Sequence, residues 1–156
     1  MSYNADASAV YAMYTDPDYI RLKNENTGGS NVEVEVTPNG EGVQIVVSRD
    51  LPAEVPSFAK KFTGETIHTT ETDVWNGINA DGTRDGVIDV DFGKQPMAVN
   101  GTLHLASAGA GSVLTVDVDV KANVPFIGRK LEGVTAEQFL RAVEAEEAIG
   151  QTWLAK

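Results

Sequence analysis

The sequence contains no cysteine, and this absence removes several kinds of chemistry at once. Such a chain forms no disulfide, offers no thiolate nucleophile and has no cysteine ligands for a structural zinc ion. Basic residues are also scarce, because 12 Lys and Arg face 23 Asp and Glu and leave a formal net charge of −11. Nucleic acids and anionic membrane surfaces both attract clustered positive charge, so neither is an expected partner.

Long apolar runs are missing as well. No stretch of the sequence approaches the ~20 apolar residues that a transmembrane helix needs. The first residues, Met1 to Asp6, contain neither a basic region nor the apolar run of a signal peptide. We therefore expect no stable membrane insertion and a cytoplasmic location.

What is present is the composition of a globular protein. Hydrophobic residues make up 42% of the 156 positions and charged residues 22%, and both fractions are ordinary for a folded domain. A chain of this length can bury roughly 70% of the surface that its unfolded form exposes. We expect one domain over residues 1–156.

Two short helices are predicted near the start of the chain. Asp6 can cap a first helix that contains Val10 and Met13. Asp16 followed by Pro17 is a second helix start signal, because proline suits the first helical turn. The polar residues 26–29 end this second helix.

The middle of the chain predicts strands, because apolar and polar residues alternate along it. The segments are joined mostly by short turns and follow one another directly, which is typical of an antiparallel meander. Asp89, Asp91, Asp117 and Asp119 fall on outward positions and predict a solvated acidic face. The predicted strands cover residues 31–36, 43–48, 67–75, 87–92, 97–106 and 112–122.

One long helix is predicted from about Lys130 to Ala155, a stretch without proline. Its polar face is charged, and its apolar face is long enough to pack against the inner face of the sheet. The apolar stripe contains Ile127, Leu131, Val134, Ala142, Ala145, Ile149 and Trp153, with Phe139 at its edge.

This order of elements resembles the helix-grip fold of the START-like (SRPBCC) superfamily. The likeness rests on the stretch 10–19 with Asp16-Pro17, on the step Val124-Pro125 before the last helix, and on Trp153. Shorter phrases at 48–52, 70–75 and 124–128 are similar to a small actinobacterial family of unknown function. The resemblance implies an α+β fold, in which a curved antiparallel sheet of about six or seven strands grips the C-terminal helix.

The resemblance also implies a cavity between sheet and helix that binds an apolar small molecule or a lipid. For each sheet residue in the expected lining, an ordinary core position is the alternative. Thr135 and Gln138 are polar residues within the apolar stripe, where they hydrogen-bond a ligand, are satisfied in the core, or lie at an exposed helix end. The expected lining contains Trp75, Ile88, Val90, Phe92, Leu103, Leu105, Val116, Val118, Thr135, Gln138, Phe139 and Ala142.

Three functions remain open at this point. The first is a non-catalytic binder, and the second is a cyclase- or dehydratase-like enzyme in the same cavity. The enzyme needs a titratable group inside, for which His68, Glu71 and Glu146 are the candidates. The third is a structural or interaction module with a filled core. The sequence leaves the ligand and the oligomeric state open.

No cofactor, metal site or catalytic constellation is expected. The two histidines are too few for a three-His zinc site. Residues 81–89 are similar to a calcium-binding loop, but Phe92 stands where such a loop has its final Glu, so a hairpin loop is the prediction. The segment 51–62 places Leu51, Val55, Phe58 and Phe62 at helical spacing, as either a lid or a connecting helix.

Overall fold

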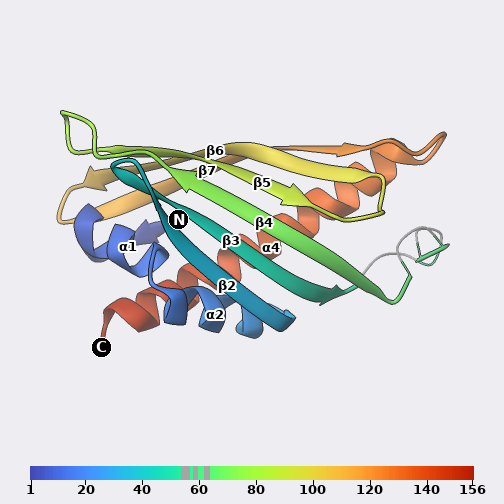
Figure 1. Ribbon diagram of the computed structural model, residues 1–156, viewed down its shortest axis with the longest axis horizontal. Coiled ribbons are helices and arrows are strands. Elements are labelled where there is room, and N and C mark those ends of the chain that lie inside the picture. The colour runs from blue at the N-terminus through green and yellow to red at the C-terminus, as the bar shows by residue number, and fades with distance from the viewer. Residues whose placement is uncertain (54–56, 58–59, 62–63) are drawn as a thin grey trace.

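The structure is a computed structural model that describes residues 1–53, 57, 60–61 and 64–156 (Figure 1). Half of the segment 51–62, including Val55, Phe58 and Phe62, lies outside the described residues, so its role as a lid or a connecting helix stays a prediction. The elements are β1 (Ser2–Tyr3), α1 (Ala7–Tyr14), α2 (Pro17–Asn26), β2 (Ser30–Asn39), β3 (Gly42–Pro52), β4 (Thr66–Trp75), β5 (Arg84–Asp91), β6 (Met97–Ala108), β7 (Gly111–Ala122) and α4 (Gly128–Leu154).

The strands form one seven-stranded antiparallel sheet in the order β1-β7-β6-β5-β4-β3-β2. Strands β2 to β7 each pair with their neighbours in sequence, so the predicted meander is confirmed. Figure 1 shows α4 running along the curved sheet, with α1 and α2 beside its C-terminal end. The architecture is the helix-grip fold that the sequence predicted.

The two N-terminal helices begin where the sequence predicts. The Asp6 carboxylate accepts a hydrogen bond from the backbone N–H of Ala9 at 2.8 Å, which caps α1. The Asp16 carboxylate accepts from the N–H of Asp18 at 2.8 Å, with Pro17 in the first turn of α2. Each cap satisfies a backbone donor that a helix start otherwise leaves unpaired.

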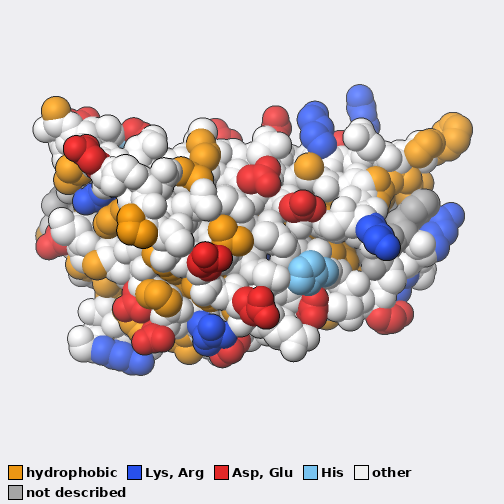
Figure 2. Space-filling view, viewed as in Figure 1, with side chains coloured by type: hydrophobic (Ala, Val, Ile, Leu, Met, Phe, Trp, Pro, Cys, Tyr) orange, Lys and Arg blue, Asp and Glu red, His pale blue; other side chains and the backbone are white. Residues whose placement is uncertain are grey.

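Alternation along the strands separates an inner from an outer face as predicted. Leu103, Leu105 and Leu114 point inward and are at most 5% exposed. Asp89, Asp91, Asp117 and Asp119 point outward and are exposed. Figure 2 shows acidic side chains spread over this outer face. The core therefore lies between the sheet and the helices.

Helix α4 follows the prediction in extent but not in every detail of its inner face. The prediction placed Ala145 on the apolar stripe, and this was wrong, because Ala145 is exposed. Glu146 faces inward instead, where Lys23 of α2 is its ion-pair partner. An acidic residue on the inner face is stable only because another element supplies the opposite charge.

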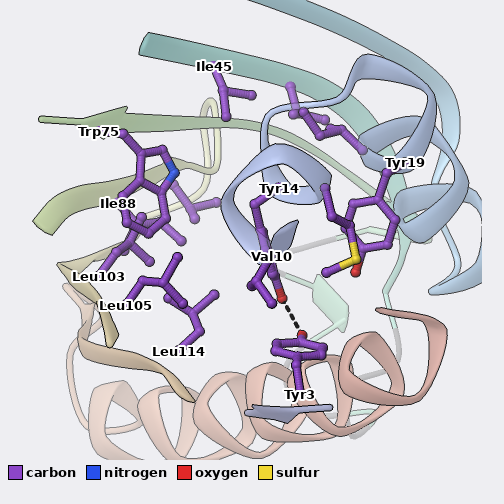
Figure 3. Packing of buried hydrophobic residues seen from close by; sticks show 14 of the residues in the cluster. Tyr3, Val10, Tyr14, Tyr19, Ile45, Trp75, Ile88, Leu103, Leu105 and Leu114 are labelled. Atoms are coloured by element: carbon purple, nitrogen blue, oxygen red, sulfur yellow. Dashed lines mark hydrogen bonds between the residues drawn. The ribbon is translucent and has the colours of Figure 1, made fainter. Parts of the chain in front are cut away.

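Gly150 is the point where α4 comes closest to the N-terminal part of the chain. A Cβ atom at this position would lie 2.6 Å from Cε1 of Tyr3 and 3.1 Å from Cε of Met13. Tyr3 is fixed in turn by Tyr14, whose hydroxyl lies 2.6 Å from its own (Figure 3). The absence of a side chain at Gly150 therefore lets the helix close one end of the core.

Candidate ligand-binding cavity

A cavity of about 230 Å³ lies between the inner face of the sheet and α4. Strands β3 to β7 and the loop after β5 supply one wall, α4 supplies the opposite wall, and α2 and the N-terminus also contribute. Nine of the residues that the sequence predicted as lining do line it, namely Trp75, Ile88, Phe92, Leu103, Val116, Thr135, Gln138, Phe139 and Ala142.

Three predicted residues do not line the cavity, and for them the prediction needs correction. Val90 and Leu105 are 5% and 1% exposed and belong to the packed core, while Val118 is partly buried against that core. Strand alternation tells which face a side chain occupies. It does not show at which positions along that face neighbouring side chains fill the space next to a residue and so separate it from the cavity.

The apolar part of the cavity is built around Trp75, at the end of β4. The indole lies over Gly86 of the neighbouring strand, where an added Cβ would come within 3.3 Å of the ring. Tyr11 of α1 meets the indole edge-on, with ring centroids 5.8 Å apart. Both contacts hold Trp75, which is 1% exposed, in one position against the cavity.

The other part of the cavity carries charge. We define the charged cluster as Lys23 of α2, Arg49 of β3, Glu71 and Asp73 of β4, and Glu146 of α4, all of which line the cavity. Two ion pairs form within it. Lys23 Nζ donates to Glu146 Oε1 at 2.9 Å, and Arg49 Nη2 donates to Glu71 Oε2 at 2.9 Å.

Both pairs are largely withdrawn from solvent. The side chains of Lys23 and Glu146 are 11% and 18% exposed, and those of Arg49 and Glu71 are 13% and 12% exposed. Charges this far from water are stable only when they are paired and hydrogen-bonded. Arg49 Nη1 also donates to the side-chain oxygen of Asn24, which ties β3 to α2.

The ion pairs decide the charge states of their members. Burial alone would lower the pKa of Lys23, but the negative charges of Glu146 and Glu71 outweigh it and hold that pKa above its usual value. Burial alone would raise the pKa of Glu71, but the charges of Arg49 and Lys23 outweigh it and lower that pKa. Lys23 and Glu71 therefore both carry their charge at neutral pH.

Asp73 is the exception within the charged cluster. Its Oδ1 atom is buried and has no hydrogen-bond partner in the described part of the chain. Burial, followed by the negative charge of Glu71, raises the pKa of Asp73 well above its usual value. The environment therefore favours the protonated, uncharged form of this carboxyl group.

Lys23, Arg49 and Asp73 line the cavity but were not predicted from the sequence as cavity residues. The sequence does indicate an inward position for Asp73. It lies an even number of residues from Ile67 and from Trp75 on β4, so its side chain must point to the same face of the sheet as theirs. No comparable signal existed for Lys23, since the partner that stabilises it lies 123 residues further along the chain.

The candidate catalytic groups are only partly brought to the cavity. Glu71 and Glu146 line it, as the enzyme hypothesis requires. His68 does not, because its side chain is 59% exposed and its Nδ1 lies 2.8 Å from Asp50 Oδ1. His104 is 48% exposed, as predicted, and its Nδ1 lies 2.6 Å from Asp85 Oδ1.

Residues 81–89 lie in the connection between β4 and β5 and in β5 itself. The Asp81 carboxylate accepts from the N–H of Thr83 at 3.0 Å and from its hydroxyl at 2.7 Å, which holds a tight turn.

Among the described residues no group of three or more His, Cys, Asp or Glu is placed to hold a metal ion. In the same part of the chain, no helix is both long and apolar enough to span a membrane.

Solved structures with the same fold cover nearly the whole chain. TTHA0849 from Thermus thermophilus matches with a TM-score of 0.67 at 12% identity, over 99% of this chain and 93% of its own. Ara h 8.0201 matches with a TM-score of 0.59 at 15% identity, over 97% and 94%. A conserved protein from Geobacillus kaustophilus matches with a TM-score of 0.57 at 14% identity, over 99% and 91%. At these identities the likeness shows the fold alone.

No curated protein matches the chain significantly by sequence. A family model does match it, over residues 1–154, and this model is described as "Protein of unknown function (DUF2505)". The match spans both N-terminal helices, the whole sheet and α4. The chain therefore belongs to the DUF2505 family.

Proposed function

We propose that this protein binds an apolar small molecule or a lipid in the cavity between the sheet and α4. The observation that carries the proposal is the cavity itself, about 230 Å³ in volume and lined by Trp75 and Leu103 from the sheet and by Phe139 from α4. Removing apolar ligand surface from water contributes about 2.5 kcal/mol per 100 Å². The START-like resemblance implies the same class of ligand.

The size of the cavity narrows the choice of ligand. Sites for drug-sized ligands usually measure roughly 300–1,000 Å³, and this cavity of about 230 Å³ is smaller. It therefore suits a compact molecule, such as a two-ring compound or a short acyl chain. Naphthalene is a suitable probe, because it is apolar, rigid and free of hydrogen-bonding groups.

A matched pair of variants tests the proposal. Ala142 lines the cavity, whereas Ala148 is exposed on the same helix. We expect Ala142→Phe to weaken naphthalene binding at least tenfold in a fluorescence titration, and Ala148→Phe to leave it unchanged. Native mass spectrometry of the purified protein would show a carried ligand directly. Equal binding by both variants, or no binding by the unmodified protein, would overturn the proposal.

A second candidate is a cyclase- or dehydratase-like enzyme in the same cavity. The observation that favours it is a pair of cavity carboxyl groups whose environments lower the pKa of Glu71 and raise that of Asp73. Neighbouring carboxyls with opposite shifts can serve as base and acid. Water loss from a two-ring β-hydroxy ketone, followed by ultraviolet absorption, would support this role if Asp73→Ala abolished it. Absence of turnover would count against it.

The third alternative, a module with a filled core, is disfavoured by the cavity.

We further propose that residues 1–156 form one START-like domain. The expected actinobacterial relationship and the expected cytoplasmic location stay predictions.

A further inference from the structure

We propose that the ligand carries one uncharged oxygen group, a hydroxyl or a carbonyl, and that Asp73 receives it and thereby determines specificity. This inference rests on the proposed function and names the chemistry of the ligand head. It depends on three features of the molecule, namely the surroundings of Asp73, its missing partner and the charge balance around it.

The surroundings of Asp73 are apolar on both sides within the sheet. Its register partners are Ile45 on β3 and Ile88 on β5. These two isoleucines are 2% and 6% exposed, and Ile88 also lines the cavity. A carboxyl group between two buried isoleucines contributes nothing to packing that an apolar residue would not, so its presence calls for another explanation.

The partner that Asp73 lacks is the second feature. Each of the other four members of the charged cluster has an ion-pair partner at 2.9 Å. Asp73 Oδ1 is buried with no hydrogen-bond partner in the part of the chain that the structure describes. Buried polar atoms are nearly always paired in folded proteins. A ligand atom in the cavity that Asp73 lines would supply the missing hydrogen bond.

The charge balance selects the kind of ligand atom. Within the charged cluster, Lys23 is neutralised by Glu146 and Arg49 by Glu71, so neither cation is left over for an anionic ligand. A fatty-acid carboxylate would lie near the charged Glu71, with no cation of the cluster left to compensate its own charge. The raised pKa of Asp73 supports a neutral partner, because a protonated carboxyl both donates and accepts hydrogen bonds.

Four naphthalene derivatives separate the possible head groups on one ring system. These probes are naphthalene, 2-naphthol, 2-naphthoate and 2-naphthylmethylammonium, which carry no group, a neutral group, an anion and a cation. For the unmodified protein at pH 7 we expect 2-naphthol to bind at least tenfold more tightly than naphthalene and than either ion. Calorimetric titration measures all four affinities under the same conditions.

Two variants assign the effect to Asp73. Asp73→Asn keeps the shape and a neutral donor and acceptor, so we expect 2-naphthol affinity within about threefold of the unmodified protein. Asp73→Leu removes both, so the advantage of 2-naphthol over naphthalene should vanish. Circular dichroism checks that both variants fold. If the Leu variant fails to fold, a large loss of 2-naphthol affinity in Asp73→Asn would still show that the charge of Asp73 is needed and would overturn the inference.

The outcomes distinguish this inference from the proposed function. Naphthalene binding that Ala142→Phe removes, with no advantage for 2-naphthol, would overturn the role of Asp73 and leave the binding function intact. Tightest binding of either ion, or an equal loss in Asp73→Asn and Asp73→Leu, would also overturn that role. No binding of any probe would overturn both proposals.

Discussion

The charged cluster and the apolar wall around Trp75 line the same cavity but are stabilised in different ways. The apolar wall is held by packing, with Trp75 fixed between Gly86 and Tyr11. The charged cluster is held by two ion pairs that join α2, β3, β4 and α4. Under the proposed function, the apolar wall would supply affinity, whereas the charged cluster would select which polar group a ligand can bring.

The largest expected effect comes from breaking an ion pair of the charged cluster. Lys23→Met leaves Glu146 buried without its partner, which typically costs about 3–5 kcal/mol of the free energy of unfolding. The double variant Lys23→Met/Glu146→Leu should recover most of this loss, since no unpaired charge remains. Urea unfolding of both variants provides the measurement. A single variant within about 1 kcal/mol of the unmodified protein would show that the pair is not effectively buried.

A smaller effect is expected on the apolar wall. Leu103 is 5% exposed and lines the cavity, so Leu103→Ala should cost about 2–3 kcal/mol, at the lower end of the range for such substitutions. The variant should also bind two-ring probes with an added methyl group better than the unmodified protein does. Unchanged selectivity among methylated naphthalenes would show that Leu103 does not limit the cavity.

The raised pKa of Asp73 should make the stability of the protein depend on pH. Its pKa in the folded protein is raised above the usual 3.8, so ionisation favours the unfolded chain as the pH rises from this value towards the folded-state pKa. Asp73→Asn does not titrate at this position, so the variant should gain stability relative to the unmodified protein as the pH increases above about 4. Thermal unfolding from pH 3 to pH 8 measures the difference. If the stability of Asp73→Asn instead fell relative to that of the unmodified protein as the pH rises, the raised pKa of Asp73 would be contradicted.

The smallest effect is expected on the outer face of the sheet. Asp119 of β7 is exposed and points away from the cavity. Asp119→Asn should therefore change the free energy of unfolding by less than about 0.5 kcal/mol and leave probe binding unchanged. A tenfold loss of naphthalene binding in this variant would mean that the probe binds outside the cavity.

The sequence predicted the apolar wall far better than the charged cluster, and the reason is physical. Alternation along β6 and β7 depends on neighbouring residues alone, so the inward positions of Leu103 and Val116 can be read locally. Whether an inward residue borders space or neighbouring atoms depends on distant elements. For this reason Val90 and Leu105 were assigned to the lining although they belong to the packed core.

The charged cluster could not be predicted because each charge is stabilised by a residue far away in the sequence. Glu146 breaks the apolar pattern of α4, and without Lys23 an edge position is the natural interpretation. Arg49 and Glu71 lie on neighbouring strands at inward positions, but their pairing depends on the register of β3 and β4. Tertiary structure, not local pattern, gives these residues their role.

The most direct test of the binding claim is a crystal of the protein soaked with 2-bromonaphthalene. Anomalous scattering locates the bromine atom without any assumption about the binding mode. The account predicts a bromine peak between the sheet and α4, in contact with cavity residues such as Trp75 or Phe139, and no such peak in Ala142→Phe. A bromine peak on the outer face, or one that persists in the cavity-filling variant, would contradict it.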